Sequence, residues 1–147
     1  MSDLRIERVD GGSEDLLRHW RHVHNLIIPT DPLSPDEVRE RAGRHLLDVA
    51  YRGDTLVGCS TVRPPAEDGP ATVIARVLPG HRRQGLGTQL YGHALAEARR
   101  LGADAVETVV LESNEDGLRF ALARGFVEVE RYLLPGDTVP YVDLRLA

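Results

Sequence analysis

One stretch of the chain decides its fold: Val77-Leu78-Pro79-Gly80-His81-Arg82-Arg83-Gln84-Gly85-Leu86-Gly87. It joins a nearly continuous apolar strand, expected over 71–78, to a helix with a regular apolar face that runs to about Leu101. The first N–H groups of a helix have no partner within the helix, and this end of its dipole is positive. Glycine allows a ligand to approach the backbone closely, and arginine offers forked donors to phosphate. The stretch therefore predicts a pyrophosphate site at the start of this helix.

Other interpretations of the glycine-rich turn fit less well. A Walker loop needs a lysine, and all 18 basic residues of this chain are arginines. A dinucleotide-binding turn needs a third glycine where the chain has Leu90, although Glu107 lies at a suitable distance for a ribose contact. The remaining alternative is a turn that only joins a strand to a helix.

The apolar pattern of the whole chain predicts the order β-α-α-β-β-β-α-β-α-β-β, a mixed sheet flanked by helices. The expected strands are 4–9, 47–51, 55–62, 71–78, 105–111, 126–134 and 139–146. The expected helices run from Ser13 or Asp15 to about Asn25, from Ser34 onward, from Gly85 to about Leu101, and from Asn114 to Arg124. In the last helix, Leu118 and Leu122 are expected to face inward.

The second helix carries a start signal of its own. Ser34 is expected to cap it, and Glu37 completes a capping box with that serine. The spacing also predicts two ion pairs one turn apart, Glu37 with Arg41 and Glu40 with Arg44.

Length and composition exclude several classes of protein. The 147 residues predict one domain, 1–147, and 18 basic against 23 acidic residues give a net charge of −5. A mildly acidic chain is a poor general ligand for nucleic acid or for an anionic membrane surface. No apolar run reaches the roughly 18 residues of a membrane span, and no signal-peptide pattern opens the sequence, so we expect a cytoplasmic protein. A single cysteine, Cys59, excludes an internal disulfide and is expected to be a small buried apolar residue.

The motif resembles the core of the GCN5-related N-acetyltransferase (GNAT) family, Val-x-Pro-x-x-Arg-x-x-Gly-x-Gly, nearly position for position. Asn114 and Gly125-Phe126 follow in the order that the family shows. The resemblance implies an α/β (α+β) fold, with a mixed, mostly antiparallel sheet of about seven strands flanked by about four helices. It also implies that the sheet opens into a V between strands 71–78 and 105–111.

The resemblance further implies that acetyl-CoA is the cosubstrate. The backbone of Val77 and Leu78 would pair with the pantetheine arm and polarise the thioester carbonyl, and Asn114 would lie beside pantetheine. Backbone N–H groups from about Arg83 to Thr88 would hold the pyrophosphate. The full set of expected cofactor-binding residues is Val77, Leu78, Arg82, Arg83, Gln84, Gly85, Leu86, Gly87, Thr88 and Asn114.

The chain departs from the family where acid and base are expected. Many members place a tyrosine, the proton donor to the leaving thiolate, where this chain has Ala121. Arg76 occupies the position of a glutamate that is often the base; it could bind a substrate carboxylate, but the simpler interpretation is that it points to solvent. Glu112 and His24 are the remaining catalytic candidates, with a solvated carboxylate and a buried, hydrogen-bonded histidine as the respective structural alternatives. No metal site is expected, because His19, His22 and His24 do not share one helix face.

Two functions remain open. The first is an acetyl-CoA-dependent N-acetyltransferase in which an unidentified small-molecule or peptide amine attacks the thioester directly. The second is a catalytically weak or inactive acyl-CoA-binding sensor or regulatory domain, which the loss of the tyrosine and of the strand glutamate favours. A homodimer is possible, and neither nucleic acid nor a membrane is an expected partner.

Overall fold

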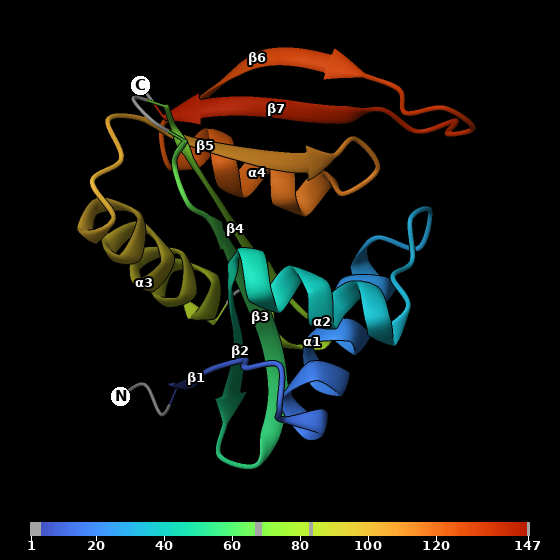
Figure 1. The fold of residues 1–147 in the computed structure, drawn as a ribbon. Coiled ribbons are helices and arrows are strands. Elements are labelled where there is room, and N and C mark those ends of the chain that lie inside the picture. The colour runs from blue at the N-terminus through green and yellow to red at the C-terminus, as the bar shows by residue number, and fades with distance from the viewer. Residues whose placement is uncertain (1–3, 67–68, 83, 147) are drawn as a thin grey trace.

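The computed structural model describes residues 4–66, 69–82 and 84–146 of the chain. These residues form a seven-stranded sheet with four α-helices, which confirms the expected fold class (Figure 1). The strands are β1 (Leu4–Arg8), β2 (Leu46–Arg52), β3 (Thr55–Arg63), β4 (Ala71–Val77), β5 (Val106–Leu111), β6 (Phe126–Tyr132) and β7 (Tyr141–Leu146). The helices are α1 (Glu14–Ile27), α2 (Pro35–Arg44), α3 (Leu86–Arg100) and α4 (Glu115–Ala123), with a short 3₁₀ turn at Pro79–His81.

The sheet opens at its middle. Its order is β1-β2-β3-β4-β5-β7-β6, and every neighbouring pair is antiparallel except β4 with β5. This parallel pair is joined only at Ala71↔Val106 and Thr72↔Glu107. Beyond Thr72 the two strands separate, which confirms the expected V-shaped opening.

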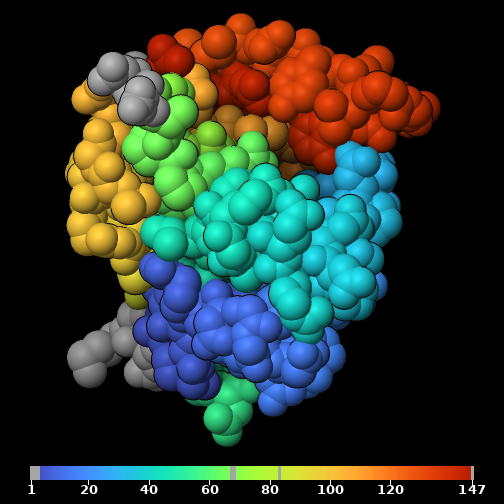
Figure 2. Space-filling view, viewed as in Figure 1, coloured from blue at the N-terminus to red at the C-terminus, as the bar shows by residue number. Residues whose placement is uncertain are grey.

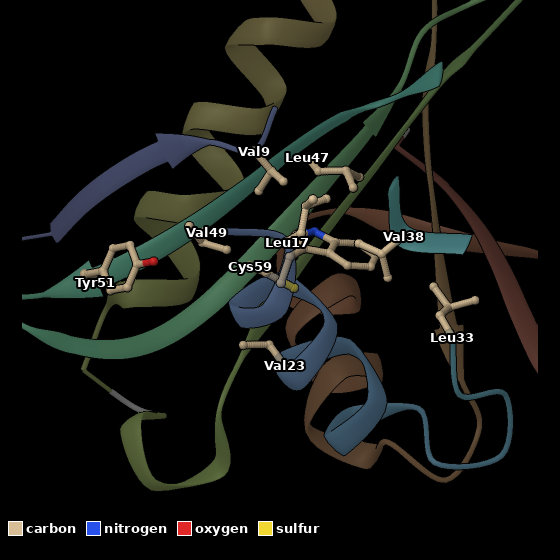
Figure 3. Close-up of a cluster of buried hydrophobic side chains, with 10 residues drawn as sticks. Val9, Leu17, Val23, Leu33, Val38, Leu47, Val49, Tyr51 and Cys59 are labelled. Atoms are coloured by element: carbon tan, nitrogen blue, oxygen red, sulfur yellow. The ribbon is translucent and has the colours of Figure 1, made fainter. Parts of the chain in front are cut away.

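Helices α1 and α2 cover one face of the sheet, and α3 lies on the other (Figure 1). Trp20 of α1 is fully buried, and its indole N–H donates to the carbonyl oxygen of Ser60 at 3.1 Å. Figure 3 shows Leu17 of α1 and Val38 of α2 gathered with Val49 and Cys59 of the sheet. The helical spacing of apolar residues therefore places both helices on this face.

Small residues allow α3 to pack closely on the opposite face of the sheet. Ala94 and Ala98 are fully buried against Val73 of β4, so the helix backbone approaches the sheet closely. Leu90 and Leu86, one and two turns before Ala94, pack in a neighbouring cluster on the same face of the sheet. This packing fixes where the first turn of α3 lies relative to β4.

The capping box of α2 forms as predicted: Ser34 Oγ accepts the Glu37 N–H at 3.2 Å, and the Glu37 carboxylate accepts the Ser34 N–H at 2.9 Å. The Arg44–Glu40 ion pair also forms, at 2.9 Å. The predicted Glu37–Arg41 pair is wrong for the residues that the structure describes, because the Glu37 carboxylate turns back to the cap.

The expectation that Leu122 faces inward is wrong. Its side chain is 58% exposed, whereas Leu118 is partly buried and Ala121 is buried. At 100° per residue, the buried side of α4 is centred between Leu118 and Ala121, and Leu122 lies about a quarter-turn away. The short helix buries only this narrow stripe.

The arm formed by β6 and β7 reaches across to the N-terminal half. Figure 2 shows this arm, in red, lying against the light-blue segment between α1 and α2. The Tyr141 hydroxyl of β7 donates to the Asp31 carboxylate of that segment at 2.5 Å. Among the described residues, no helix combines the length and the apolarity that crossing a lipid bilayer requires.

Candidate functional site

The separation of β4 from β5 creates a cleft with a volume of about 470 Å³, a size typical of small-molecule sites. Its walls come from β4 residues 73–77, β5 residues 108–111, the first turn of α3 and one side of α4. Six of the predicted cofactor-binding residues line it: Val77, Arg82, Gly85, Gly87, Thr88 and Asn114.

The first turn of α3 lies at this cleft. Gly85 precedes the helix with φ 78° and ψ 2°, a left-handed conformation that side chains disfavour. The first N–H group that bonds back to the cap is that of Gln89, which donates to the Gly85 carbonyl at 3.2 Å. The N–H groups of Leu86, Gly87 and Thr88 precede it in the helix and have no intrahelical acceptor. N–H groups in this position, at the positive end of a helix dipole, can bind an anion.

Val77 presents its backbone to the gap, whereas Leu78 does not. The Leu78 N–H donates to the Val57 carbonyl of β3 at 2.8 Å. Backbone groups alternate sides along an extended strand, so the Val77 N–H points away from β3 and toward the opening. The backbone N–H that faces the opening is therefore that of Val77, whereas the Leu78 N–H is already paired with β3.

Arg82 ties the two walls of the cleft together. Its Nε donates to the Val77 carbonyl at 2.9 Å, and its Nη1 lies 3.0 Å from the Asp116 carboxylate of α4. Much of its donor capacity is thus used within the protein rather than kept for phosphate. The predicted contact of Arg83 lies outside the described residues.

Two predicted residues turn their side chains away from the cleft. The Gln84 side chain is exposed and accepts a hydrogen bond from Arg52 at 2.5 Å. Leu86 is 4% exposed and packs with Leu90 under the sheet. Both can contribute only backbone groups to a ligand.

Asn114 is held in place by the helix that it begins. Its Oδ1 accepts the Gly117 N–H at 3.0 Å, and its own N–H donates to the Leu111 carbonyl at 2.8 Å. A Cβ atom at Gly117 would lie 2.5 Å from the Asn114 amide nitrogen, so glycine is required there. Asn114 therefore lines the cleft with a fixed side chain.

At the family's tyrosine position the cleft has only a methyl group, since Ala121 is buried in its wall. The phenol that lines the cleft is that of Tyr91, whose ring packs edge-on to Phe120 and Phe126. Burial raises the pKa of Tyr91 above its usual range. From the sequence, Tyr91 is expected at the core or rim and, with Tyr132, is the first residue to change to Phe should a proton donor be found; its place in the cleft depends on how α3 docks against α4.

A second pocket, of about 510 Å³, lies under α1 and α2 and meets the cleft at the opening of the sheet. Residues that line both are Ile28, Ile74, Arg76, Val109 and Leu111. The second pocket is further lined by His24, Thr30, Asp31, Pro32, Leu33, Glu37, Arg41, Arg63, Tyr132, Leu134 and Tyr141. A molecule in the second pocket can therefore reach one in the cleft.

Arg76 does not point to solvent, so the simpler expectation for it is wrong. It lines both cavities, and its Nη1 is buried without a hydrogen-bond partner. Cys59 is its neighbour on β3 and is fully buried, as predicted. Burial raises the pKa of the Cys59 thiol to about 11, which keeps it protonated at neutral pH.

The two catalytic candidates lie in different places. His24 is 4% exposed, lines the second pocket, stacks on Trp20 and contacts the Asn25 side-chain oxygen at 2.9 Å. Burial, with repulsion from Arg76, lowers the pKa of His24 to about 4. Glu112 is not among the lining residues of either cavity; its carboxylate pairs with Arg131 at 2.8 Å.

No group of three or more His, Cys, Asp or Glu side chains in the described part of the chain could hold a metal ion. Sequence reasoning did not place Arg41, Arg63, Tyr132 and Tyr141 in one pocket. They come from four separate elements, and only the strand register and the reach of the β6–β7 arm bring them together.

A mixed sheet that opens beside a helix N-terminus defines an α/β protein with a cleft at the opening of the sheet. The model of the Acetyltransferase (GNAT) family matches residues 13–126, so this chain belongs to that family. YvbK of Bacillus subtilis (strain 168), an uncharacterized N-acetyltransferase, is 30% identical over 107 residues. That match covers 73% of this chain and 64% of YvbK.

Solved structures share the fold at low sequence identity. YncA from Salmonella typhimurium, solved with its cofactor acetyl-CoA, has a TM-score of 0.75 at 15% identity, covering 99% of this chain and 94% of that one. A GNAT family acetyltransferase from Elizabethkingia anophelis with acetyl-CoA bound has a TM-score of 0.71 at 16% identity, covering 99% of each chain.

Proposed function

We propose that this protein is an acetyl-CoA-dependent N-acetyltransferase whose acceptor amine attacks the thioester directly. One observation carries the proposal: a single cleft is lined by the unpaired first turn of α3 and by the backbone of Val77. Family membership supports the activity, and the structural neighbours from S. typhimurium and E. anophelis contain acetyl-CoA.

The cleft suits an extended phosphorylated ligand. The pyrophosphate would accept hydrogen bonds from the N–H groups of Leu86, Gly87 and Thr88. Pantetheine would then lie along β4 beyond Thr72, where β5 no longer pairs with that strand. Asn114 would flank it from the opposite wall. The thioester carbonyl would accept the Val77 N–H.

The chemistry uses few side chains. The lone pair of a neutral amine attacks the thioester carbon, and the Val77 N–H stabilises the oxyanion that forms. The carbon–sulfur bond then breaks, CoA leaves as a thiolate, and the nitrogen loses its proton. Since Ala121 offers no donor, the thiolate takes its proton from the amine or from water. General acid catalysis typically contributes about 10²–10⁴-fold, so its absence slows the reaction without preventing it.

Acceptor deprotonation is helped by the pocket itself. Arg76 lies where both cavities meet, and a fixed cation beside an ammonium group favours its neutral form. His24 lies in the second pocket and stays a prediction as the base, although its pKa of about 4 makes it a weak one at pH 7. Glu112 stays a weaker prediction, because it pairs with Arg131 outside both cavities.

The alternative function is an acyl-CoA-binding sensor or regulatory domain, and the observation in its favour is Ala121 at the acid position. Release of CoA from acetyl-CoA in the presence of an amine panel separates the two functions. Turnover supports the enzyme; tight binding without turnover of any amine supports the sensor. The acceptor, whether a small molecule or a peptide, and a homodimer stay predictions.

Ligand binding provides the first test. A ligand at one hundred times its dissociation constant that binds only the folded state stabilises a protein by about 2.7 kcal/mol. Acetyl-CoA should therefore raise the melting temperature, and NADH and ATP at equal concentration should not. An unchanged melting temperature with millimolar acetyl-CoA, together with an increase with NADH, would overturn the proposal.

A further inference from the structure

Three arginine side chains converge on the second pocket from three elements: Arg41 from α2, Arg63 from β3 and Arg76 from β4. The strand register explains how two of them meet. Arg63 lies opposite Thr72, and Thr72 and Arg76 share a face because side chains alternate along a strand. Both arginines therefore lie on the face that α1 and α2 cover, and Arg41 reaches them from α2.

These three guanidinium groups have no carboxylate partner. In the part of the chain that the structure describes, none of the ion pairs includes Arg41, Arg63 or Arg76. Arg63 Nε and Arg76 Nη1 are moreover buried without any hydrogen-bond partner. Buried donors and charges are costly unless they are paired, so this arrangement is poised for an acceptor.

The two acids that line the same pocket are already engaged. The Asp31 carboxylate accepts the Tyr141 hydroxyl, and the Glu37 carboxylate accepts the Ser34 N–H of the capping box. The Tyr132 hydroxyl is likewise used, by the Asp143 carboxylate at 3.1 Å. With His24 neutral, the two lining carboxylates and the three arginines leave the lining of the pocket with a net positive charge.

Burial lowers the pKa of all three arginines, and each also repels another member of the cluster. They remain charged at neutral pH, because even a large shift from 12.5 leaves guanidinium protonated. An anion between them would remove this repulsion and satisfy the orphaned donors at once. Arginine pairs with carboxylates through two parallel hydrogen bonds, which also orients the bound group.

We propose that the acceptor is a small amine that carries a carboxylate, with the carboxylate held by Arg41, Arg63 and Arg76. This inference rests on the proposed acetyltransferase function and names its substrate class. Arg76 is adjacent in the chain to Val77, and it lines both cavities. The proposed anion site therefore adjoins the strand whose backbone we assign to the thioester. A volume of about 510 Å³ with apolar walls at Ile28 and Leu33 accommodates its side chain.

The experiment compares acceptors that differ only in the charged group. The panel contains the α-amino acids with β-alanine and 4-aminobutyrate, their primary amides, and the matching decarboxylated amines. CoA release reports kcat/KM for each. For the best acceptor, we expect the carboxylate to exceed its amide by at least about tenfold, the effect of one or two charged hydrogen bonds. Aminophosphonates extend the panel to a second oxyanion, and acetylation of these alone would overturn the carboxylate assignment.

Variants locate the effect. Arg63→Gln should reduce the ratio of kcat/KM for the carboxylate to kcat/KM for its amide to about one. Arg41→Gln should reduce this ratio partly. Acetyl-CoA affinity should not change in Arg63→Gln, because Arg63 does not line the cofactor cleft. Arg99→Gln on the exposed side of α3 removes the same charge far from the pocket and serves as the matched control.

The outcomes separate the two proposals. Equal or faster acetylation of the neutral amines, or an unchanged ratio in folded Arg63→Gln, overturns the carboxylate site and leaves the acetyltransferase intact. Acetylation of a peptide amine but of no panel member overturns the carboxylate site; acetyl-CoA binding without acetylation of the panel or of a peptide amine overturns the acetyltransferase. A loss of the ratio in Arg99→Gln equal to that in Arg63→Gln would show a general charge effect and also overturn the site.

Discussion

Gly87 offers the sharpest test of the cofactor cleft, because stability and binding should change in opposite directions. A Cβ atom at this position would lie 3.5 Å from Phe120 Cε1 and 3.6 Å from Val77 Cγ2, ordinary contact distances. Alanine therefore fits the folded protein, and replacing a helical glycine by alanine stabilises by about 0.5–1 kcal/mol. The added methyl group nevertheless projects into the cleft beside an N–H that we assign to pyrophosphate.

The binding loss can be estimated from the contacts at stake. A hydrogen bond to a charged group contributes about 1.5–3 kcal/mol, which corresponds to about a 10- to 150-fold change in dissociation constant. We expect Gly87→Ala to weaken acetyl-CoA binding by about tenfold. Gly87→Val, whose extra methyl groups cannot avoid the ligand, should weaken it by about a hundredfold or more.

Titration calorimetry with acetyl-CoA measures the affinity, and urea unfolding measures the free energy of unfolding. Gly92→Ala, also in α3 but with nothing within 4 Å of its added Cβ, is the matched control: it should gain the same helix stability and bind normally. If Gly87→Val stays folded and binds acetyl-CoA within about twofold of the unchanged protein, the first turn of α3 does not hold the pyrophosphate.

Three further predictions follow from the same geometry. With Ala121 in place of a phenol, the chemical rate should rise with pH as the amine loses its proton and then stay level through pH 10; a fall there in folded protein would reveal a tyrosine acid. His24 has its pKa lowered to about 4 in the folded protein, so the unfolded chain binds more protons between pH 6.5 and 4. About 3 kcal/mol of stability should be lost as the pH falls through that window, and urea unfolding of His24→Gln should show a flatter pH dependence; an equal slope in both proteins would refute the assignment. Asp116→Ala removes the partly exposed partner of Arg82, and should lower the free energy of unfolding by less than about 1 kcal/mol while calorimetry shows acetyl-CoA affinity falling several-fold; unchanged affinity would show that this bridge does not shape the cleft.

Much of the fold follows from local sequence signals. The capping box at Ser34 and the apolar stripe around Trp20 are determined by residues within a turn or two of one another, so single-chain reasoning reaches them. Leu122 shows the limit of such reasoning. Whether it is buried depends on how α4 is rotated against the sheet, and that rotation is a tertiary property.

The phosphate-binding half of the site was predictable for the same reason, since Gly85 and Gly87 and the helix that follows them are contiguous in sequence. The acceptor half was not. Arg63 and Arg76 share a face only through the β3–β4 register, and Arg41 joins them because Glu37 turns to its own helix cap. The sequence does not show which side chains surround each arginine in space, so the lack of a carboxylate partner cannot be predicted from it.

The two-residue junction between β4 and β5 has a consequence for the local opening motions of the protein. Backbone pairing links the ribbon of β1 to β4 with the ribbon of β5 to β7 only at Ala71 and Thr72. The two parts of the sheet can therefore unfold locally with different free energies. A ligand bound between them would contact both and stabilise them together. Acetyl-CoA should slow amide hydrogen exchange in β7, a strand that it does not touch. CoA retains the pyrophosphate and pantetheine of acetyl-CoA, so under the proposed function the product should hold the two parts of the sheet together as the substrate does, and we expect its release to be slow.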